Sequence, residues 1–192
     1  MKIRITPGAI LMFAAMLVAG DRLFLAGVLA AAVHECGHLL AARLLHIPLR
    51  LLELDIGGAR ILPVGEPPTF LSQGLLAAAG PAASLLLALL LHPIIPPNGV
   101  SFCLLLQNST LSLALFNLLP ISGFDGGNIL SALLTPRLAY GRAQTVCRAC
   151  AYLSLLLLFS LSACLLLRYG ENMPLAVFCA SLFARLFLQE NS

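Results

Sequence analysis

Apolar runs of membrane-spanning length dominate this chain of 192 residues. A helix needs about 20 apolar residues, with a working range of roughly 17–25, to cross the hydrocarbon core of a bilayer. Five runs come within a few residues of that length: Leu23–Leu45, Gly74–Leu91, Phe102–Leu119, Ala151–Leu167 and Pro174–Leu188. The chain is 60% hydrophobic and only 10% charged, whereas soluble domains carry about 25% charged residues. The sequence therefore predicts an all-α polytopic membrane protein.

The first apolar run, Ala9–Gly20, is shorter than the other five. It fits a sixth span, and it also fits the core of a signal peptide, because Lys2 and Arg4 precede it and small residues end it. We expect the run to be retained, which gives six spans in a single domain over residues 1–192. The apolar runs leave no room for a separate soluble domain.

Basic residues are distributed unevenly between the predicted loops. With six spans and an inside N-terminus, nine Lys and Arg residues fall on the inner side and two, Arg22 and Arg168, on the outer side. Cytoplasmic loops carry the excess of Lys and Arg, which supports this orientation. The net charge of +3 is too small and too scattered for a nucleic-acid surface. We therefore expect the lipid bilayer and membrane proteins, and no nucleic acid, as partners.

The run Leu23–Leu45 contains His34-Glu35-Cys36-Gly37-His38, which brings ionisable side chains into the membrane. Such groups are costly in hydrocarbon and mark functional sites. His34 and His38 are four residues apart, so on a helix they share one face and converge on one ion, and neutral imidazoles suit zinc. Glu35 is then placed to take a proton from the attacking water. The predicted orientation puts His38 roughly 10 Å from the cytoplasmic end of its helix.

A catalytic zinc site needs a third protein ligand. The elongated form of the motif is absent, because Ala41 and Leu44 stand at its Gly and His positions. Asp125 follows the run Phe102–Leu119, in a segment rich in Pro and Gly on the same predicted side of the membrane as the histidines. Broken backbone at membrane depth is tolerated where it is buried or lines a cavity. Asp125 is therefore the preferred third ligand.

Other ionisable groups compete for the role of third ligand. The acidic competitors are interpreted as charges of a hairpin or of the membrane interface, and they are Glu53, Asp55 and Glu66. His46 lies past the end of the predicted helix, and His92 falls on the outer side of the membrane, so neither easily reaches the cluster. A Glu ligand from Glu53 or Glu66 stays open as an alternative.

Two further patterns lie outside the zinc motif. Leu51–Leu62 alternates apolar and charged residues around a Gly-Gly pair, which is typical of a β-hairpin; an irregular amphipathic loop at the membrane interface is the alternative. Cys147 and Cys150 have metal or redox spacing, but no second pair completes a four-ligand site. We interpret them as one turn of a membrane-flanking helix, and most of the other cysteines as small apolar residues within the spans.

These motifs together resemble those of the site-2 protease family, the intramembrane zinc metalloproteases. The resemblance rests on three segments in the family's usual order, which are His34–His38, Ala79-Gly80-Pro81, and Asn117-Leu118-Leu119-Pro120 with Asp125-Gly126-Gly127. It implies that His34, His38 and Asp125 are zinc ligands and that Glu35 is the general base. It also implies that Asn117 faces the active site as a polariser of the scissile carbonyl, and that the hairpin presents an edge to an unwound substrate.

The small six-span layout is similar to the stage IV sporulation protein FB subgroup of that family. The sequence contains no CBS domain, which members of the subgroup usually carry, and Ser84 and Phe124 depart from the family pattern. The resemblance implies a multi-pass protein of the bacterial cell membrane that hydrolyses a peptide bond in a transmembrane or membrane-associated protein near the cytoplasmic face. A sporulation pro-sigma factor is one such substrate, and membrane regulatory proteins are further partners. An inactive membrane scaffold and a metal transporter are the rival functions, although the paired broken helices of transporters are absent.

Overall fold

The computed structural model describes residues 2–5, 20–55, 58–63, 65, 69–95 and 101–169. Two of the six predicted spans, Pro174–Leu188 and Ala9–Gly20 except for its last residue, lie outside these ranges. The chain divides into two compact units, Met1–Leu118 and Leu119–Ser192. The single domain expected from the sequence stays a prediction.

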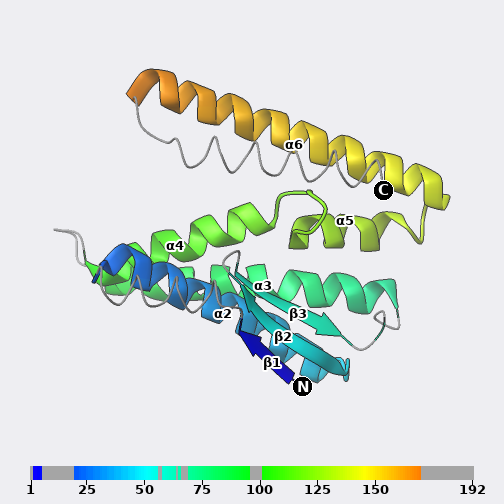
Figure 1. Ribbon diagram of the computed structural model, residues 1–192, viewed down its shortest axis with the longest axis horizontal. Helices are drawn as coiled ribbons and strands as arrows, with labels where there is room; N and C mark the ends of the chain where they lie inside the picture. Colours follow the sequence, from blue (N-terminus) through cyan, green and yellow to red (C-terminus); the bar gives the residue numbers. More distant parts are fainter. Residues whose placement is uncertain are drawn as a thin grey trace. The chain divides into compact units, whose positions relative to one another are not determined.

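The first unit contains three long helices that pack pairwise (Figure 1). They are α2 (Arg22–Leu44), α3 (Phe70–Leu91) and α4 (Phe102–Asn117), and a short 3₁₀ turn, η1 (His92–Ile94), follows α3. The buried residues between these helices are mainly small, and include Ala26, Ala30, Ala42, Ala77, Ala88 and Ala114. Small residues let helix backbones approach closely, which is the usual way that helices pack in membranes.

A three-stranded sheet belongs to the same unit (Figure 1). Its strands are β1 (Lys2–Ile5), β2 (Leu49–Asp55) and β3 (Gly58–Pro63), in the order β1-β2-β3. Strands β2 and β3 are antiparallel, with Glu53 opposite Arg60, over the residues where the sequence predicts a hairpin. Residues 56–57, where the sequence predicts the turn of the hairpin, lie outside the described ranges. Strand β1 pairs in parallel with β2, and the sequence analysis interprets two of its residues, Lys2 and Arg4, only as charges that precede an apolar run.

The second unit contains two helices, α5 (Asp125–Leu134) and α6 (Tyr140–Tyr169), which pack on each other. Its core is formed by Ile121 and Leu155, and Leu119, Phe124 and Leu158 pack around them. Helix α6 begins 11 residues before the predicted span Ala151–Leu167. The preceding residues mix polar and apolar side chains and contain no helix breaker after Gly141, so the helix extends through them beyond the apolar run.

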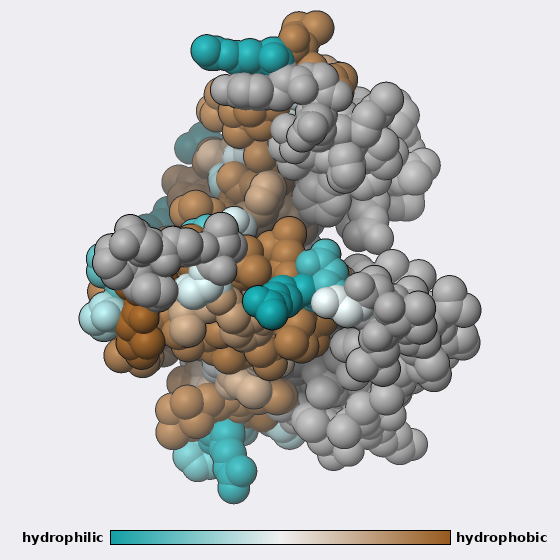
Figure 2. Space-filling model, turned by 90° about the vertical axis from the view of Figure 1, so that its left-hand side faces the viewer, coloured by the Kyte–Doolittle hydropathy of each residue, from teal (hydrophilic) through white to brown (hydrophobic). Residues whose placement is uncertain are grey.

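Among the described residues, three helical segments are long and apolar enough to cross a membrane: Arg22–Leu44, Phe70–Ile94 and Gly141–Arg168. Helix α4, with 16 residues, is apolar but shorter. Large apolar side chains point outward from these helices, as at Leu89 (69% exposed) and Leu167 (89% exposed). Figure 2 shows hydrophobic residues, in brown, over most of the coloured surface. Helices with leucines outside and alanines inside are those of a membrane protein, because lipid replaces water around them.

Candidate metal centre

Helix α2 holds the two histidines of the predicted zinc motif on its buried face. The helix begins after Asp21, whose side chain accepts a hydrogen bond of 2.9 Å from the Leu23 N–H, as an N-cap residue does. Its end is marked by His46, which has a positive φ of 53° just past the last turn. His34 lies on the same face as the buried Ala26 and Ala30, and its side chain is only 3% exposed. The helix thus carries an ionisable ring into its packed interface.

The imidazoles of His34 and His38 meet as the spacing predicts. Their ring centroids lie 4.9 Å apart with planes at 78°, and their Nε2 atoms lie 3.2 Å apart. Two nitrogens bound to one tetrahedral zinc at 2.0–2.1 Å are separated by about 3.3 Å. The two Nε2 atoms therefore have the separation that a shared zinc ion requires, and the pair fits this metal.

Helix α3 supplies a second partner to each ring. The His38 Nδ1 lies 2.8 Å from the backbone oxygen of Leu76, and the His34 Nδ1 lies 3.1 Å from the Oγ of Ser84. Because a carbonyl oxygen only accepts, the Nδ1 of His38 carries the proton, and in the neutral ring Nε2 then presents a lone pair. Metal-binding histidines use their second nitrogen in this way.

Two glycines allow α2 and α3 to approach so closely. A Cβ on Gly80 would lie 2.7 Å from the Nε2 of His34 and would also collide with the ring of His38. A Cβ on Gly37, within the zinc motif, would lie 2.7 Å from the Cβ of Ala83. Both distances are shorter than real carbon contacts allow. Gly80, which belongs to the predicted Ala-Gly-Pro landmark, is therefore required where the helix faces the two imidazoles.

Glu35 lies next to His34 on α2 and its side chain is half-buried. The following residue, Cys36, is exposed. The predicted base thus lies beside the histidine pair, partly sheltered from the surroundings.

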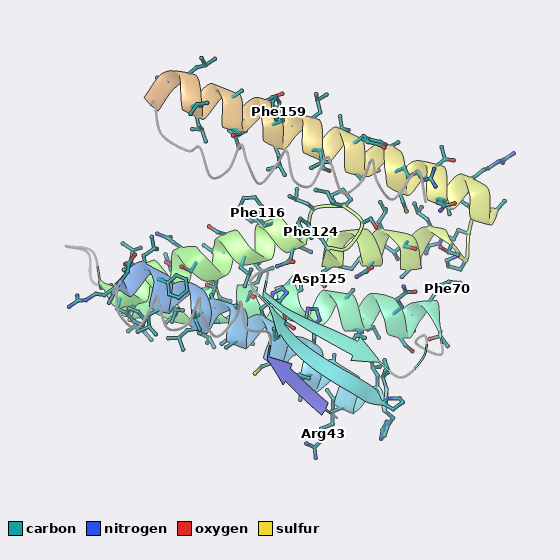
Figure 3. The ribbon with its side chains drawn as sticks, in the orientation of Figure 1. Arg43, Phe70, Phe116, Phe124, Asp125 and Phe159 are labelled. Atoms are coloured by element: carbon teal, nitrogen blue, oxygen red, sulfur yellow. The ribbon has the colours of Figure 1, made fainter. Side chains whose placement is uncertain are left out.

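Asp125, the predicted third ligand, is the first residue of α5 in the second unit. A turn precedes it in which Gly123 has a φ of +91° and the Phe124 N–H donates to the Ile121 oxygen at 3.0 Å. A Cβ on Gly127 would collide with the backbone of Ile121. Figure 3 labels Phe124 and Asp125 where this turn enters α5. The carboxylate is half-buried in the first helical turn, where the helix dipole favours a negative charge.

Asp125 thus begins a helix of its own, after the Pro- and Gly-rich segment that follows the predicted span Phe102–Leu119. The two histidines belong to the first unit and Asp125 to the second. Its role as a ligand of the same ion is therefore part of the proposal below.

Asn117 is the last residue of α4 and is half-buried. Its amide Nδ2 donates a hydrogen bond of 3.1 Å to the oxygen of Leu113, one turn earlier in the same helix. An amide has two N–H donors, so this bond is compatible with a second partner.

The competing groups have other positions. Glu53 is part of β2, Glu66 lies outside the described residues, and His46 is exposed past the end of α2. His92, in η1, lies 3.4 Å from the Nε2 of Gln107. Cys147 and Cys150 are half-buried one turn apart in α6.

The sequence analysis did not identify Leu76 and Ser84 as partners of the histidines; Ser84 was noted only as a departure from the family pattern, four residues after Gly80.

The chain is similar to known proteins in sequence and in structure. No family model matches the chain. It is 36% identical to a Synechocystis protein named "Putative zinc metalloprotease sll0528" over 106 residues, which are 53% of the chain. The chain spans only 28% of the length of that relative. The site-2 protease from Methanocaldococcus jannaschii superposes with a TM-score of 0.62, at 22% identity, covering 94% of this chain and 87% of that one. The protein therefore has the fold of a site-2 protease.

Proposed function

We propose that this protein is an intramembrane zinc metalloprotease that hydrolyses a peptide bond in a transmembrane or membrane-associated protein. The observation that carries the proposal is the 3.2 Å approach of the His34 and His38 Nε2 atoms inside an apolar helix. Burying two imidazoles among alanines is costly unless they bind something. The site-2 protease fold and the similarity to a protein named as a zinc metalloprotease support the same conclusion.

In this proposal His34, His38 and Asp125 hold the ion. Zinc, when bound, would polarise the scissile carbonyl and lower the pKa of a water molecule, so that this water can act as a nucleophile at neutral pH. Asp125 supplies the negative charge that two neutral imidazoles lack. The turn from Ile121 to Phe124 leads directly into α5 and so fixes where the helix that carries Asp125 begins.

Glu35 acts as the general base. It takes a proton from the attacking water and passes it to the nitrogen of the leaving amine, as a carboxylate beside a catalytic centre does. Asn117 donates an amide N–H to the oxygen of the scissile carbonyl. These roles rest on the order of the motifs in the sequence and on the half-buried position of both side chains.

The sheet provides a place for an extended substrate. Strand β2 is central and paired on both sides, so within the described residues the sheet has two outer edges, along β1 and along β3. A substrate segment that has unwound from its helix adds to one of these edges by main-chain hydrogen bonds. Unwinding exposes the peptide bond to the attacking water, and we therefore expect helix-breaking residues near the cleavage point.

The finer features of the proposal come from the sequence. Six spans with nine basic residues on one side favour an active site toward the cytoplasmic face, and the resemblance implies a bacterial cell membrane. The resemblance to the sporulation subgroup adds a pro-sigma factor as one substrate and membrane proteins as regulators. An inactive scaffold with the same motif, or a third ligand from Glu53 or Glu66, are the alternatives that experiment must separate.

A cleavage assay with a matched pair of variants tests the catalytic role. The purified protein is reconstituted with a model transmembrane peptide that carries Asn-Pro near its cytoplasmic end, and products are identified by mass spectrometry. Glu35→Gln should keep its zinc and lose cleavage by about two to four orders of magnitude, the range typical of a general base. Cys36→Ser, at the exposed neighbouring position, should cleave like the wild type. Unchanged cleavage by Glu35→Gln would contradict the assignment.

A further inference from the structure

Three residues of α3, spaced four apart, face the histidine pair. Leu76 provides a backbone oxygen to the His38 ring, Gly80 leaves space for both rings, and Ser84 lies against the His34 ring. Positions four apart form one stripe along a helix. The two rings therefore have different hydrogen-bond partners on α3: a backbone oxygen for His38 and a side-chain hydroxyl for His34.

The hydroxyl of Ser84 differs from other hydroxyls on the apolar helices. Thr110, Ser154 and Ser160 each donate to a carbonyl three or four residues earlier in their own helix, at distances of 2.8–3.0 Å. This arrangement is the usual way to satisfy a hydroxyl in an apolar helix. The Oγ of Ser84 instead lies 3.1 Å from the ring of a residue 50 positions away, on another helix. Its contact is thus tertiary and specific to His34.

Burial makes this contact important for His34. Ser84 is fully buried (0% exposed) and His34 is 3% exposed, so water has little access to the Nδ1 atom of the ring. A buried donor that loses its partner is left unsatisfied. Without the hydroxyl, the ring is free to turn over and direct Nδ1, the wrong nitrogen, toward the position between the two rings.

We propose that Ser84 is a positioning residue for the metal centre. With an ion on Nε2, the His34 Nδ1 would carry the proton and donate it to this hydroxyl, which holds the ring in the orientation in which Nε2 faces His38. Such partners typically change metal affinity by about 10- to 100-fold. The inference rests on the proposed zinc site and deepens it, since it identifies a residue that controls affinity without touching the ion.

Zinc affinity, measured by competition with a chelator in detergent, tests the proposal. Ser84→Ala should bind zinc about 10- to 100-fold more weakly than the wild type and should alter the visible absorption spectrum of the cobalt-substituted protein. The matched control is Ser162→Ala, since Ser162 is also a buried helical serine (1% exposed) and its hydroxyl has no hydrogen-bond partner among the described residues. This control should match the wild type in affinity and spectrum.

Two further measurements separate positioning from a general loss of structure. In the chelated protein Ser84→Ala should still unfold cooperatively, at a lower melting temperature than Ser162→Ala because the buried Nδ1 of His34 loses its partner. Added zinc should then raise the melting temperature of Ser84→Ala by less than it raises that of Ser162→Ala. If Ser84→Ala cannot be purified, Ser84→Thr and Ser84→Val give the same test at equal volume, and only the threonine variant should keep the affinity of the wild type.

The outcomes distinguish this inference from the proposed function. Zinc in the wild type with unchanged affinity and spectrum in Ser84→Ala, or in Ser84→Val, would overturn the positioning role and leave the zinc site standing. A wild-type protein that binds no zinc would overturn the proposed function and the inference with it.

Discussion

The region around the histidines and the turn before Asp125 both depend on a glycine with no space for a side chain, but their surroundings differ. At Gly80 the space is occupied by the rings of His34 and His38, which come from another helix. At Gly127 it is occupied by the backbone of Ile121, only six residues earlier in the same segment. One arrangement is therefore tertiary and the other is local.

This difference shows how the predicted ligands acquire their positions. The histidine rings meet their partners on α3 only where α2 and α3 pack in the described way. Any change in how these two helices pack therefore moves both ligands. The backbone at Asp125 is set locally, by the turn between Ile121 and the first residues of α5. A disturbance of the turn should therefore move one ligand and leave the histidine pair intact.

The largest effect is expected for Gly80→Ala. The added methyl group collides with both imidazoles, so the variant should lose measurable zinc binding, and overpacking should destabilise the fold by about 1–3 kcal/mol. Gly27→Ala is the control on α2, because a Cβ there meets nothing within 4 Å. It should keep its zinc and gain up to about 1 kcal/mol of helix stability. Zinc content and thermal unfolding in detergent measure both variants, and full zinc occupancy in Gly80→Ala would contradict the described crossing.

A smaller effect is expected for Gly127→Ala. Its methyl group pushes the start of α5 away from Ile121 and shifts Asp125, which should weaken zinc binding by about tenfold, equivalent to about 1.4 kcal/mol. Chelator competition measures this change. Gly141→Ala, also in the second unit and with nothing near its Cβ, should bind zinc like the wild type. Equal affinity in both variants would show that the turn does not position a ligand.

Gly123→Ala should have a still smaller effect on zinc. Gly123 has a φ of +91°, which an alanine adopts only with strain of about 1–3 kcal/mol. The turn should relax rather than break, so we expect a lower unfolding temperature with zinc affinity reduced by only a few-fold. Gly123→Asn should restore part of the stability, because asparagine tolerates positive φ better than alanine. An alanine variant as stable as the wild type would contradict the strained turn.

No effect on zinc is expected from removing the Cys147 and Cys150 pair. The two half-buried thiols lie on α6, one turn apart, and no further cysteine or histidine of that helix accompanies them until Cys164. The double variant with alanine at both positions should keep the metal content and the zinc affinity of the wild type. Loss of a metal ion from this variant in elemental analysis would reveal a second site.

The sequence was sufficient for those parts of the site that depend on spacing along one element. His34 and His38 are four residues apart on a helix that a run of apolar residues predicts, so their convergence follows from helical geometry alone. The bounds of α2 and α4 also agree with the predicted spans within two residues. Local chemistry likewise predicts that the Pro- and Gly-rich segment before Asp125 breaks the helix.

The partners of the histidines could not be predicted in the same way. Leu76 and Ser84 lie about 40 and 50 residues from the rings that they contact, and their roles depend on which face of α3 meets α2. Strand β1 was missed for a similar reason, because its parallel pairing with β2 joins segments on either side of a whole helix. Tertiary contacts of this kind leave little periodic signal in the sequence.

The most direct test of the account is the metal content of the purified protein by mass spectrometry, for the wild type beside Asp125→Ala, Glu53→Ala and Glu66→Ala. We predict about one zinc per chain in the wild type and in both glutamate variants, and little or none in Asp125→Ala. Zinc fully retained in Asp125→Ala and lost in a glutamate variant would contradict the account and would assign the third ligand to that glutamate.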